Sequence, residues 1–272
     1  MKPVQELDPV LGIILPDLRH LWICSHFGIL AELELKGHPV HSSSIFETFQ
    51  NPTSDYDLPM CSHYQGLKEA HRYERSFGVR PPPEPGKHDL WPGYLGSFIR
   101  RHPHADVGDD AVLPFEALNG LFGLVPHWAT DTKITKHTYN ARSETAAEKP
   151  SFRDAWKRGQ HCIIPADAIF EPDWRSGKAV ATRIERSDGG PLGIAGLWAA
   201  WKSPKGEMVH SYTMLTVNAD GHDLIMKFHK PTDEKRMLVV LHRDRYADWL
   251  NAMPVESMEF MQQLSAEQLK TA

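Results

Sequence analysis

The sequence predicts a mixed α+β domain that follows an N-terminal segment of different character. Its composition, 41% hydrophobic and 24% charged with a mean hydropathy of -0.43, is that of a globular chain. From Phe115 onward, short hydrophobic runs alternate with turn residues, a pattern that favours strands. Two other stretches are typical of short helices, so helices and strands are expected in the same domain.

The first sixty residues differ from the rest in charge and in pattern. They hold three Lys and Arg against eight Asp and Glu, and the remaining 212 residues hold 27 of each sign. A helix is expected over Asp17–Lys36, whereas His38–Pro59 has little hydrophobic period. Charged residues and a proline interrupt the apolar stretch Leu11–Leu35, which excludes a spanning helix and argues against a signal peptide. We expect residues 1–59 to be an extension that is removed or that precedes the true start.

Prolines, capping residues and hydrophobic runs predict the loops, helices and strands of the domain. Arg80–Gly86 contains four prolines, which remove backbone donors, so an exposed loop is expected there. Ser151 can cap a helix that runs to Arg158, with Asp154 at the capping-box position, and a second helix is expected over Arg243–Asn251. Strands are expected at His161–Pro165, Ala179–Ile184, Ile194–Trp198 and Tyr212–Val217, with a turn at Ser187–Gly190.

The cysteines and histidines set the expected compartment and metal content. Cys24, Cys61 and Cys162 are too few and too scattered for a disulfide framework, so a reducing, cytoplasmic setting is expected. None of the sixteen histidines belongs to a pattern with two paired halves, so we expect no metal and no cofactor. Cys24 and Cys162 are expected to be buried, inert thiols because apolar residues surround them.

Positive charge gathers between Lys133 and Arg186, where eleven basic side chains stand against seven acidic ones. A basic patch that faces a polyanion and a solvated mixed-charge surface both fit this count.

Cys61 follows Met60 at the point where the composition changes. If the chain begins there, Cys61 carries a thiol beside a free α-amine, and both groups are partly deprotonated at neutral pH. Such a 1,2-aminothiol condenses with an aldehyde to an imine, which the thiol then closes to a thiazolidine. An internal Cys61 could do neither through its nitrogen, which would be an amide.

Six short motifs carry the most specific signal, and they occur in a fixed order. They are Tyr139–Thr145, Lys149–Arg153, Cys162–Asp167 with Ile169–Glu171, Ala195–Trp198, Leu215–Ala219, and Phe228–Pro231 with Asp233–Met237. In this order and spacing the chain resembles the SOS response-associated peptidase family, from Met60 to about Asn251.

The resemblance implies a single α+β domain with curved, mainly antiparallel sheets and flanking short helices. It places that domain at residues 60–255, before a C-terminal tail at 256–272. The implied activity is that of an abasic site processing protein, which binds single-stranded DNA and links itself covalently to abasic sites through an N-terminal cysteine. The implied location is cytoplasmic, with the protein on the nucleoid when it is bound to DNA and not at a membrane; protein partners are not indicated.

Four residues match the catalytic positions of the family. Cys61 matches the nucleophile, Asn140 the asparagine of an Asn-Ala-Arg motif, Glu171 the acidic residue, and His229 the histidine. Their chemistry suits the reaction, because a carboxyl group can open the closed sugar and dehydrate the carbinolamine, and an asparagine can hold the amine or a substrate oxygen. A histidine can orient the sugar or act as base in a strand-cleaving β-elimination.

Two further residues are candidates for DNA contact. Arg142 matches an arginine expected to bind phosphate, for which a guanidinium offers a bidentate grip. Trp128 could stack on an exposed base or pack in the core. Taken singly, Asn140 is typical of a turn, Glu171 of a surface, His229 of a loop and Arg142 of a salt bridge; only their joint occurrence favours a site.

The sequence departs from the family pattern at several points. Cys61-Ser62-His63 replaces Cys-Gly-Arg, Pro172 and Asp173 break an aromatic-Glu-Trp run, and Leu238 stands where proline is usual. Two other functions stay open: a cysteine-type peptidase that removes its own leader with Cys61 and His229, and a non-catalytic single-stranded DNA binder with an inert Cys61. Lyase activity on abasic sites is a further expectation.

Overall fold

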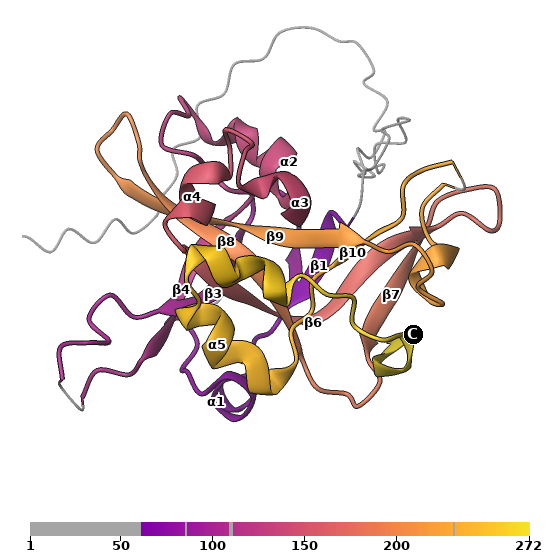
Figure 1. Ribbon diagram of the computed structural model, residues 1–272, viewed down its shortest axis with the longest axis horizontal. Helices are drawn as coiled ribbons and strands as arrows, with labels where there is room; N and C mark the ends of the chain where they lie inside the picture. The colour runs from indigo at the N-terminus through magenta and orange to yellow at the C-terminus, as the bar shows by residue number, and fades with distance from the viewer. Residues whose placement is uncertain (1–60, 85, 109–110, 231) are drawn as a thin grey trace, which may run out of the picture. The chain divides into compact units, whose positions relative to one another are not determined.

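The computed structural model describes residues 61–84, 86–108, 111–230 and 232–272 (Figure 1). The expected helix over Asp17–Lys36 and the expected burial of Cys24 lie outside these residues. Within them the chain forms an eleven-stranded sheet with short helices around it, which confirms the predicted α+β class. The strands are β1 His63–Gly66, β2 Asp89–Leu90, β3 Leu95–Arg101, β4 Phe115–Phe122, β5 Asn140–Arg142, β6 His161–Asp173, β7 Val180–Arg186, β8 Leu192–Lys202, β9 Met208–Asn218, β10 Arg236–Leu238 and β11 Leu269–Thr271.

The helices of the described residues are short and connect or cover the strands. They are α1 Ala70–Phe77, α2 Thr135–Thr138, α3 Ser143–Ala146, α4 Arg153–Lys157 and α5 Tyr246–Asn251, with the 3-10 turns η1 Thr132–Ile134, η2 Ile225–Lys227, η3 Arg243–Arg245, η4 Pro254–Phe260 and η5 Ala266–Gln268.

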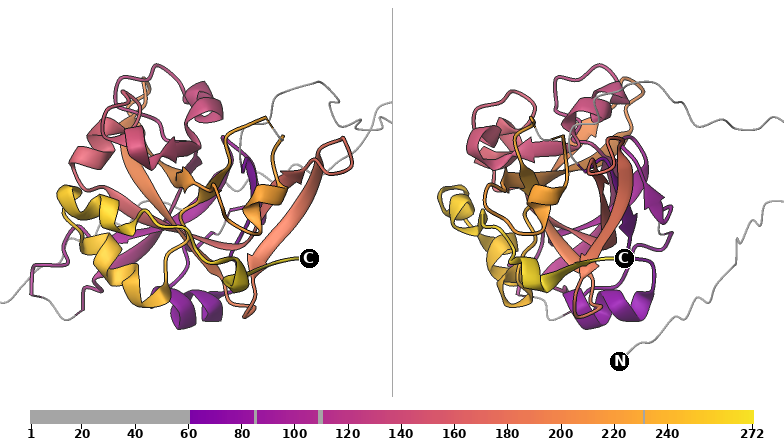
Figure 2. Two further views of the ribbon diagram at one scale, coloured as in Figure 1. Left: turned by 45° about the vertical axis from the view of Figure 1, so that its right-hand side comes forward. Right: turned by 90° about the vertical axis from the view of Figure 1, so that its right-hand side faces the viewer.

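Five strands close into a ring. β3 pairs with β4, β4 with β9, β9 with β8, β8 with β6, and β6 returns to β3 through Ile99 opposite Ile163. The β4–β9 pair is parallel and the other four pairs are antiparallel, as expected for a mainly antiparallel sheet. Figure 2 shows the strongly curved strands from two sides. Closure leaves these strands without free edges and buries an interior lined by aromatic residues.

Strand β6 is the longest element and carries one wall of the candidate site. Its expected span ended at Pro165, yet the strand continues to Asp173. The Pro165 carbonyl oxygen accepts a hydrogen bond from the backbone N–H of Leu67, just after β1. The nitrogen and the carbonyl of one strand residue point to the same side, so the proline nitrogen also faces this neighbour. At this point the partner of β6 changes from β3 to β1. The proline therefore removes no ladder bond at that point, and β6 passes from the ring to a second set of partners.

The two helices predicted within the described residues exist, but their details differ. Helix α4 begins one residue later than expected, with Phe152 at its N-cap and no side-chain cap hydrogen bond, so Ser151 does not cap it. The segment Arg243–Asn251 is a 3-10 turn followed by α5. Trp249 anchors α5 on β6, because its indole N–H donates to the Cys162 carbonyl at 2.8 Å and the side chain is fully buried.

The C-terminal segment is part of the folded unit, in contrast to the expected tail at 256–272. Phe260, Leu264 and Leu269 are buried, and β11 pairs antiparallel with β7. Its apolar residues are spaced irregularly along 3-10 turns, so the segment shows no helical or strand period that could reveal this packing from the sequence.

Candidate active site

Four chain segments bring the predicted catalytic residues to one end of the sheet. Cys61 lies just before β1, which pairs with β6 so that His63 stands opposite Phe170, the neighbour of Glu171. Asn140 begins β5, which runs parallel to β9. His229 follows η2 in a loop that touches the end of β6 through the bridge between Asp173 and Phe228.

Cys61 and Glu171 contact each other directly. Both the thiol and the backbone N–H of Cys61 donate to the Glu171 carboxyl group, and the thiol also lies 3.4 Å from the His63 carbonyl oxygen. Both residues are almost fully buried. Burial, and then the negative charge of Glu171, raise the pKa of the Cys61 thiol well above its usual range. The thiol is therefore protonated in this arrangement.

Glu171 and His229 form a second contact within the site. Burial raises the pKa of Glu171 to about 8, although its hydrogen bonds with Cys61 act in the opposite direction. Burial lowers the pKa of His229, and the positive charge of Lys235 adds to that effect. His229 Nε2 lies 3.5 Å from Glu171 Oε2, and at neutral pH this is a contact between a neutral acid and a neutral base rather than an ion pair.

The backbone at His229 has an unusual conformation that its surroundings hold. Its φ is +64°, a left-handed value that a β-branched or bulky residue rarely adopts. The Lys235 ammonium donates to three successive carbonyl oxygens, at 3.0 Å to Phe228, 3.3 Å to His229 and 2.6 Å to Lys230. The His229 N–H donates to the Pro172 carbonyl at 2.9 Å, so the loop is fixed to the end of β6 as well.

Asn140 holds the main chain of Cys61. Its Nδ2 donates to the Cys61 carbonyl oxygen at 3.1 Å. Its Oδ1 is buried and has no hydrogen-bond partner among the described residues, nor has Glu171 Oε2. Buried polar atoms without partners are rare in folded proteins, so Asn140 Oδ1 is a free acceptor of the site, and Glu171 Oε2 is free to donate the proton that the carboxyl group keeps near neutral pH.

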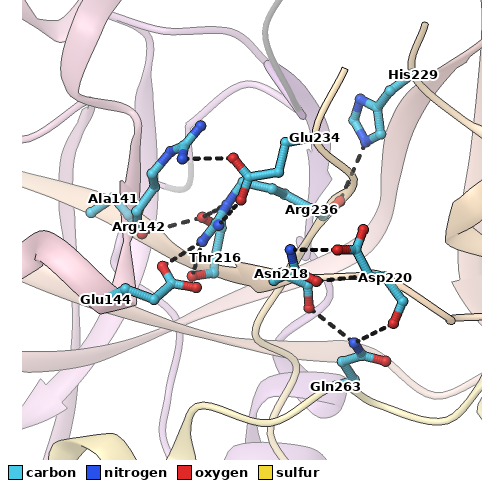
Figure 3. Close-up of polar contacts among 10 residues, drawn as sticks. All are labelled: Ala141, Arg142, Glu144, Thr216, Asn218, Asp220, His229, Glu234, Arg236 and Gln263. Carbon is cyan, nitrogen blue, oxygen red and sulfur yellow. Dashed lines mark hydrogen bonds and ion pairs between the residues drawn. The ribbon is translucent and has the colours of Figure 1, made fainter. Parts of the chain in front are cut away.

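Arg142 lies next to this group but belongs to a network of charges (Figure 3). Its Nη1 is 2.7 Å from Glu234 Oε2, and its side chain is 52% exposed. Glu234 also accepts from the buried Arg236 at 2.7 Å, and Arg236 donates in addition to Glu144 and Thr216. His229 Nε2 lies 3.3 Å from the Arg236 carbonyl, so this network supports the histidine.

Trp128 lies in the loop between β4 and η1, with nearly half of its surface exposed. Its indole donates to the Pro150 carbonyl at 3.3 Å, on the segment that leads into α4. Within the described ranges it shares no hydrogen bond or ring contact with Cys61, Asn140, Glu171 or His229.

Several residues of the site were not singled out from the sequence. Tyr139 lies close enough to Cys61 and Glu171 that burial, and then their charges, raise its pKa to about 12. Lys235 donates to the His229 carbonyl oxygen, and the Arg236 carbonyl oxygen contacts His229 Nε2, so both residues hold the loop of His229. All three belong to the quoted motifs, so their positions were visible, but only the fold shows what their side chains touch.

No group of three or more His, Cys, Asp or Glu side chains that could hold a metal ion occurs in the part of the chain that the structure describes. Cys162 is fully buried, and burial raises its pKa. Among the described helices, none is long and apolar enough to cross a membrane.

A family model described as SOS response associated peptidase (SRAP) matches residues 60–272. The chain belongs to this family. It is 35% identical over 131 residues to the abasic site processing protein YoqW of Bacillus subtilis, a match that covers 48% of this chain and 55% of that protein. It is 28% identical over 221 residues to the abasic site processing protein HMCES of Gallus gallus, covering 72% of this chain and 62% of that one. The chain thus spans little more than half the length of these relatives.

Solved structures share the fold. A crystal structure of a protein from Bordetella bronchiseptica is 46% identical and superposes with a TM-score of 0.70, covering 78% of this chain and 98% of that one. A protein from Bacteroides thetaiotaomicron, at 21% identity and a TM-score of 0.63, covers the same share of this chain and 90% of its own. The second likeness shows the fold alone.

Proposed function

We propose that this protein processes abasic sites in single-stranded DNA by forming a covalent crosslink through Cys61. One observation carries the proposal: the Glu171 carboxyl, which keeps its proton near neutral pH, contacts both the backbone nitrogen and the thiol of Cys61. These are the two atoms that a thiazolidine joins to one carbon. The names of the relatives, abasic site processing proteins, support the same substrate.

The reaction balances with the groups present. In the form that begins at Cys61, the α-amine attacks C1′ of the opened abasic sugar, and the carbonyl oxygen leaves as one water molecule. The thiol sulfur then adds to the imine carbon, and its proton passes to the nitrogen. One C–N and one C–S bond form, the C=O bond breaks, and no oxidant or reductant is needed.

Each neighbouring residue has a role in this scheme. Glu171 donates a proton to the ring oxygen and later to the departing hydroxyl, and after each donation its carboxylate takes a proton back, first from the C1′ hydroxyl and then from the nitrogen. Asn140 holds the Cys61 main chain and offers its free Oδ1 to the amine or to a sugar hydroxyl. His229, kept neutral by burial, can accept the proton that strand cleavage by β-elimination would release.

This scheme requires Cys61 to be the first residue of the reactive form. We therefore propose that residues 1–59 and Met60 are absent from that form. The family match begins at residue 60, and the acidic excess of the chain ends there, which supports this start.

The contacts favour the crosslink over the peptidase alternative. A cysteine peptidase needs a base that takes the proton of the thiol. Here the Cys61 thiol is hydrogen-bonded to the Glu171 carboxyl group and to the His63 carbonyl oxygen. His229 Nε2 instead contacts Glu171 Oε2 and the Arg236 carbonyl oxygen. His229 is therefore not placed to take the proton of the Cys61 thiol.

Intact-mass spectrometry tests the proposal. The chain beginning at Cys61, and the full chain beside it, are mixed with a single-stranded oligonucleotide that holds one abasic site. We expect a species of the summed masses less one water from the form beginning at Cys61, and none from an oligonucleotide without the abasic site. No such species from that form would refute the proposal. Equal adduct from a chain that keeps residues 1–60 would show that the α-amine is unnecessary.

A further inference from the structure

A column of three stacked rings rises beside the proposed site. The His63 ring lies between Phe170 and Trp91, with centroids 4.1 Å and 4.3 Å away and interplanar angles of 14° and 5°. Phe170 immediately precedes Glu171, and His63 follows Cys61 by two residues. The column therefore lies over the stretch of β1 and β6 that carries Cys61 and Glu171, on the face opposite the Glu171 side chain, and it ends at Trp91.

The outer end of the column is open. Trp91 is 41% exposed although His63 covers one of its faces, and among the described residues no second ring or cation stacks on it. Large exposed aromatic rings with one free face bind flat partners by stacking.

The column is held rigidly. His63 Nε2 and Gln65 Nε2 lie 3.0 Å and 3.2 Å from Asp89 Oδ1, which fixes the imidazole between its neighbours. The turn after Trp91 is closed by the Tyr94 N–H on the Trp91 carbonyl at 2.9 Å. Gly93 at its centre has a φ of +88°, which favours glycine, and its N–H donates to the Phe122 carbonyl of β4.

The charges around the column distinguish a base from a phosphate. Asp89 places a half-exposed carboxylate at its side, which repels a phosphate but not a nucleobase. On the other side of the turn, Lys87 lies 4.5 Å above the ring of Tyr94, which is 40% exposed. Exposed aromatic rings beside a cation are typical of proteins that bind single strands.

We infer that Trp91 stacks on the nucleobase next to the abasic position and so extends the Phe170–His63–Trp91 column by a fourth ring. This inference rests on the proposed function, because the partner is the strand whose abasic sugar reaches Cys61. The stacked base holds the strand in place while the ring opens and the amine attacks, so Trp91 is a positioning residue for the reaction.

The test is a double-mutant cycle in which residue 91 of the protein and one neighbouring base of the DNA are changed singly and together. The oligonucleotide carries a central tetrahydrofuran analogue, which cannot form the crosslink, and the nucleotide on its 5′ or its 3′ side is either adenine or a second tetrahydrofuran. Affinity is measured by fluorescence anisotropy for the parent, Trp91→Ala and Trp91→Phe, in the full chain and in the form beginning at Cys61. Leu95→Ala is the control, because Leu95 is similarly exposed at the start of β3 and has no ring.

For the parent we expect removal of one neighbouring base, on one side only, to weaken binding about tenfold. Trp91→Ala should weaken binding to the complete strand by the same factor and should lose nothing more when that base is removed. In Trp91→Phe, removal of the neighbouring base should still weaken binding by most of this factor. In Leu95→Ala it should weaken binding by the full factor.

The inference would be overturned if Trp91→Ala and base removal each weakened binding and their factors multiplied. It would also be overturned if the affinity of the parent did not change on removal of either neighbouring base. These outcomes are separate from a failure of the proposed function. That failure would appear as the absence of any adduct between the parent and a true abasic site, whereas the cycle uses only non-covalent binding.

Discussion

Glu171 is a buried acid whose proton makes the stability of the folded protein depend on pH. Its pKa in the folded state, about 8, lies above its ordinary value of 4.5, so the folded protein holds a proton that the unfolded chain releases between these values. The stability therefore decreases as the pH rises from about 4.5 to about 8. The site keeps its acid at a cost in stability.

Glu171→Gln removes this dependence. We expect the variant to be more stable than the parent at pH 9, by on the order of a few kcal/mol, and the difference to disappear near pH 4.5. Urea unfolding across that range measures it. The same variant should form the adduct roughly 10²- to 10⁴-fold more slowly, because the acid and base are lost. A constant stability difference across the range would show that Glu171 is ionised in the folded protein.

Arg142 presents its guanidinium at the surface beside the site, where Glu234 already binds it. If it also contacts a phosphate, Arg142→Ala should reduce the slope of log affinity against log salt by about 0.7 for single-stranded DNA. Titrations at several salt concentrations measure the slope. Arg175→Ala is a suitable control, since Arg175 is also exposed and paired with an acidic residue, Asp173. An unchanged slope for Arg142→Ala would identify it as a salt-bridge residue only.

At the scale of elements, the loop between η2 and β10 depends on one buried lysine. Lys235 is 6% exposed and donates to three successive carbonyl oxygens around His229. The negative ends of these carbonyl dipoles stabilise the buried ammonium by charge-assisted hydrogen bonds. The left-handed backbone of His229 is therefore maintained by a residue six positions along the chain.

Lys235→Met tests this dependence. It leaves three carbonyls without their donor, so we expect a loss of about 2 to 5 kcal/mol in unfolding free energy, measured by urea unfolding. Adduct formation should slow as the loop of His229 loosens. Lys178→Met, at an exposed lysine in the turn before β7, should change stability by less than about 0.5 kcal/mol. Similar effects of the two substitutions would show that the three carbonyl contacts contribute nothing.

In the molecule as a whole, local sequence patterns predicted β6 to β9 and the segments of α4 and α5, but not α1, the strands β1 to β3, or how far the elements extend and how they join. The motifs located Asn140, Glu171 and His229, and the change of composition at Met60 pointed to Cys61. The contacts of these residues depend on pairings between distant strands, such as Ile99 with Ile163. The extension of β6 beyond Pro165 and the packing of residues 256–272 follow from such long-range partners, which a local hydrophobic period does not encode.

The C-terminal segment provides a test at this scale. Leu264 is fully buried, so Leu264→Ala should lower the unfolding free energy of the whole domain by about 2 to 5 kcal/mol. Val255→Ala is the matched control, because Val255 is 83% exposed and should contribute almost nothing. Thermal and urea unfolding compare the two. A detached tail would predict equal and negligible effects.

If the Cys61 thiol closes a thiazolidine on the abasic sugar, the adduct should outlast an imine, so the durability of the adduct tests the proposed role of the thiol. Cys61→Ser in the form that begins at residue 61 keeps the α-amine and still forms an imine, but its hydroxyl closes the ring less effectively than a thiol. Adducts of both proteins with abasic single-stranded DNA are heated and followed on a denaturing gel over hours, with and without borohydride. We expect the parent adduct to persist without reduction and the Cys61→Ser adduct to be lost unless it is reduced. Equal durability of the two adducts would contradict this role and leave an amine-based reaction in which the thiol takes no part.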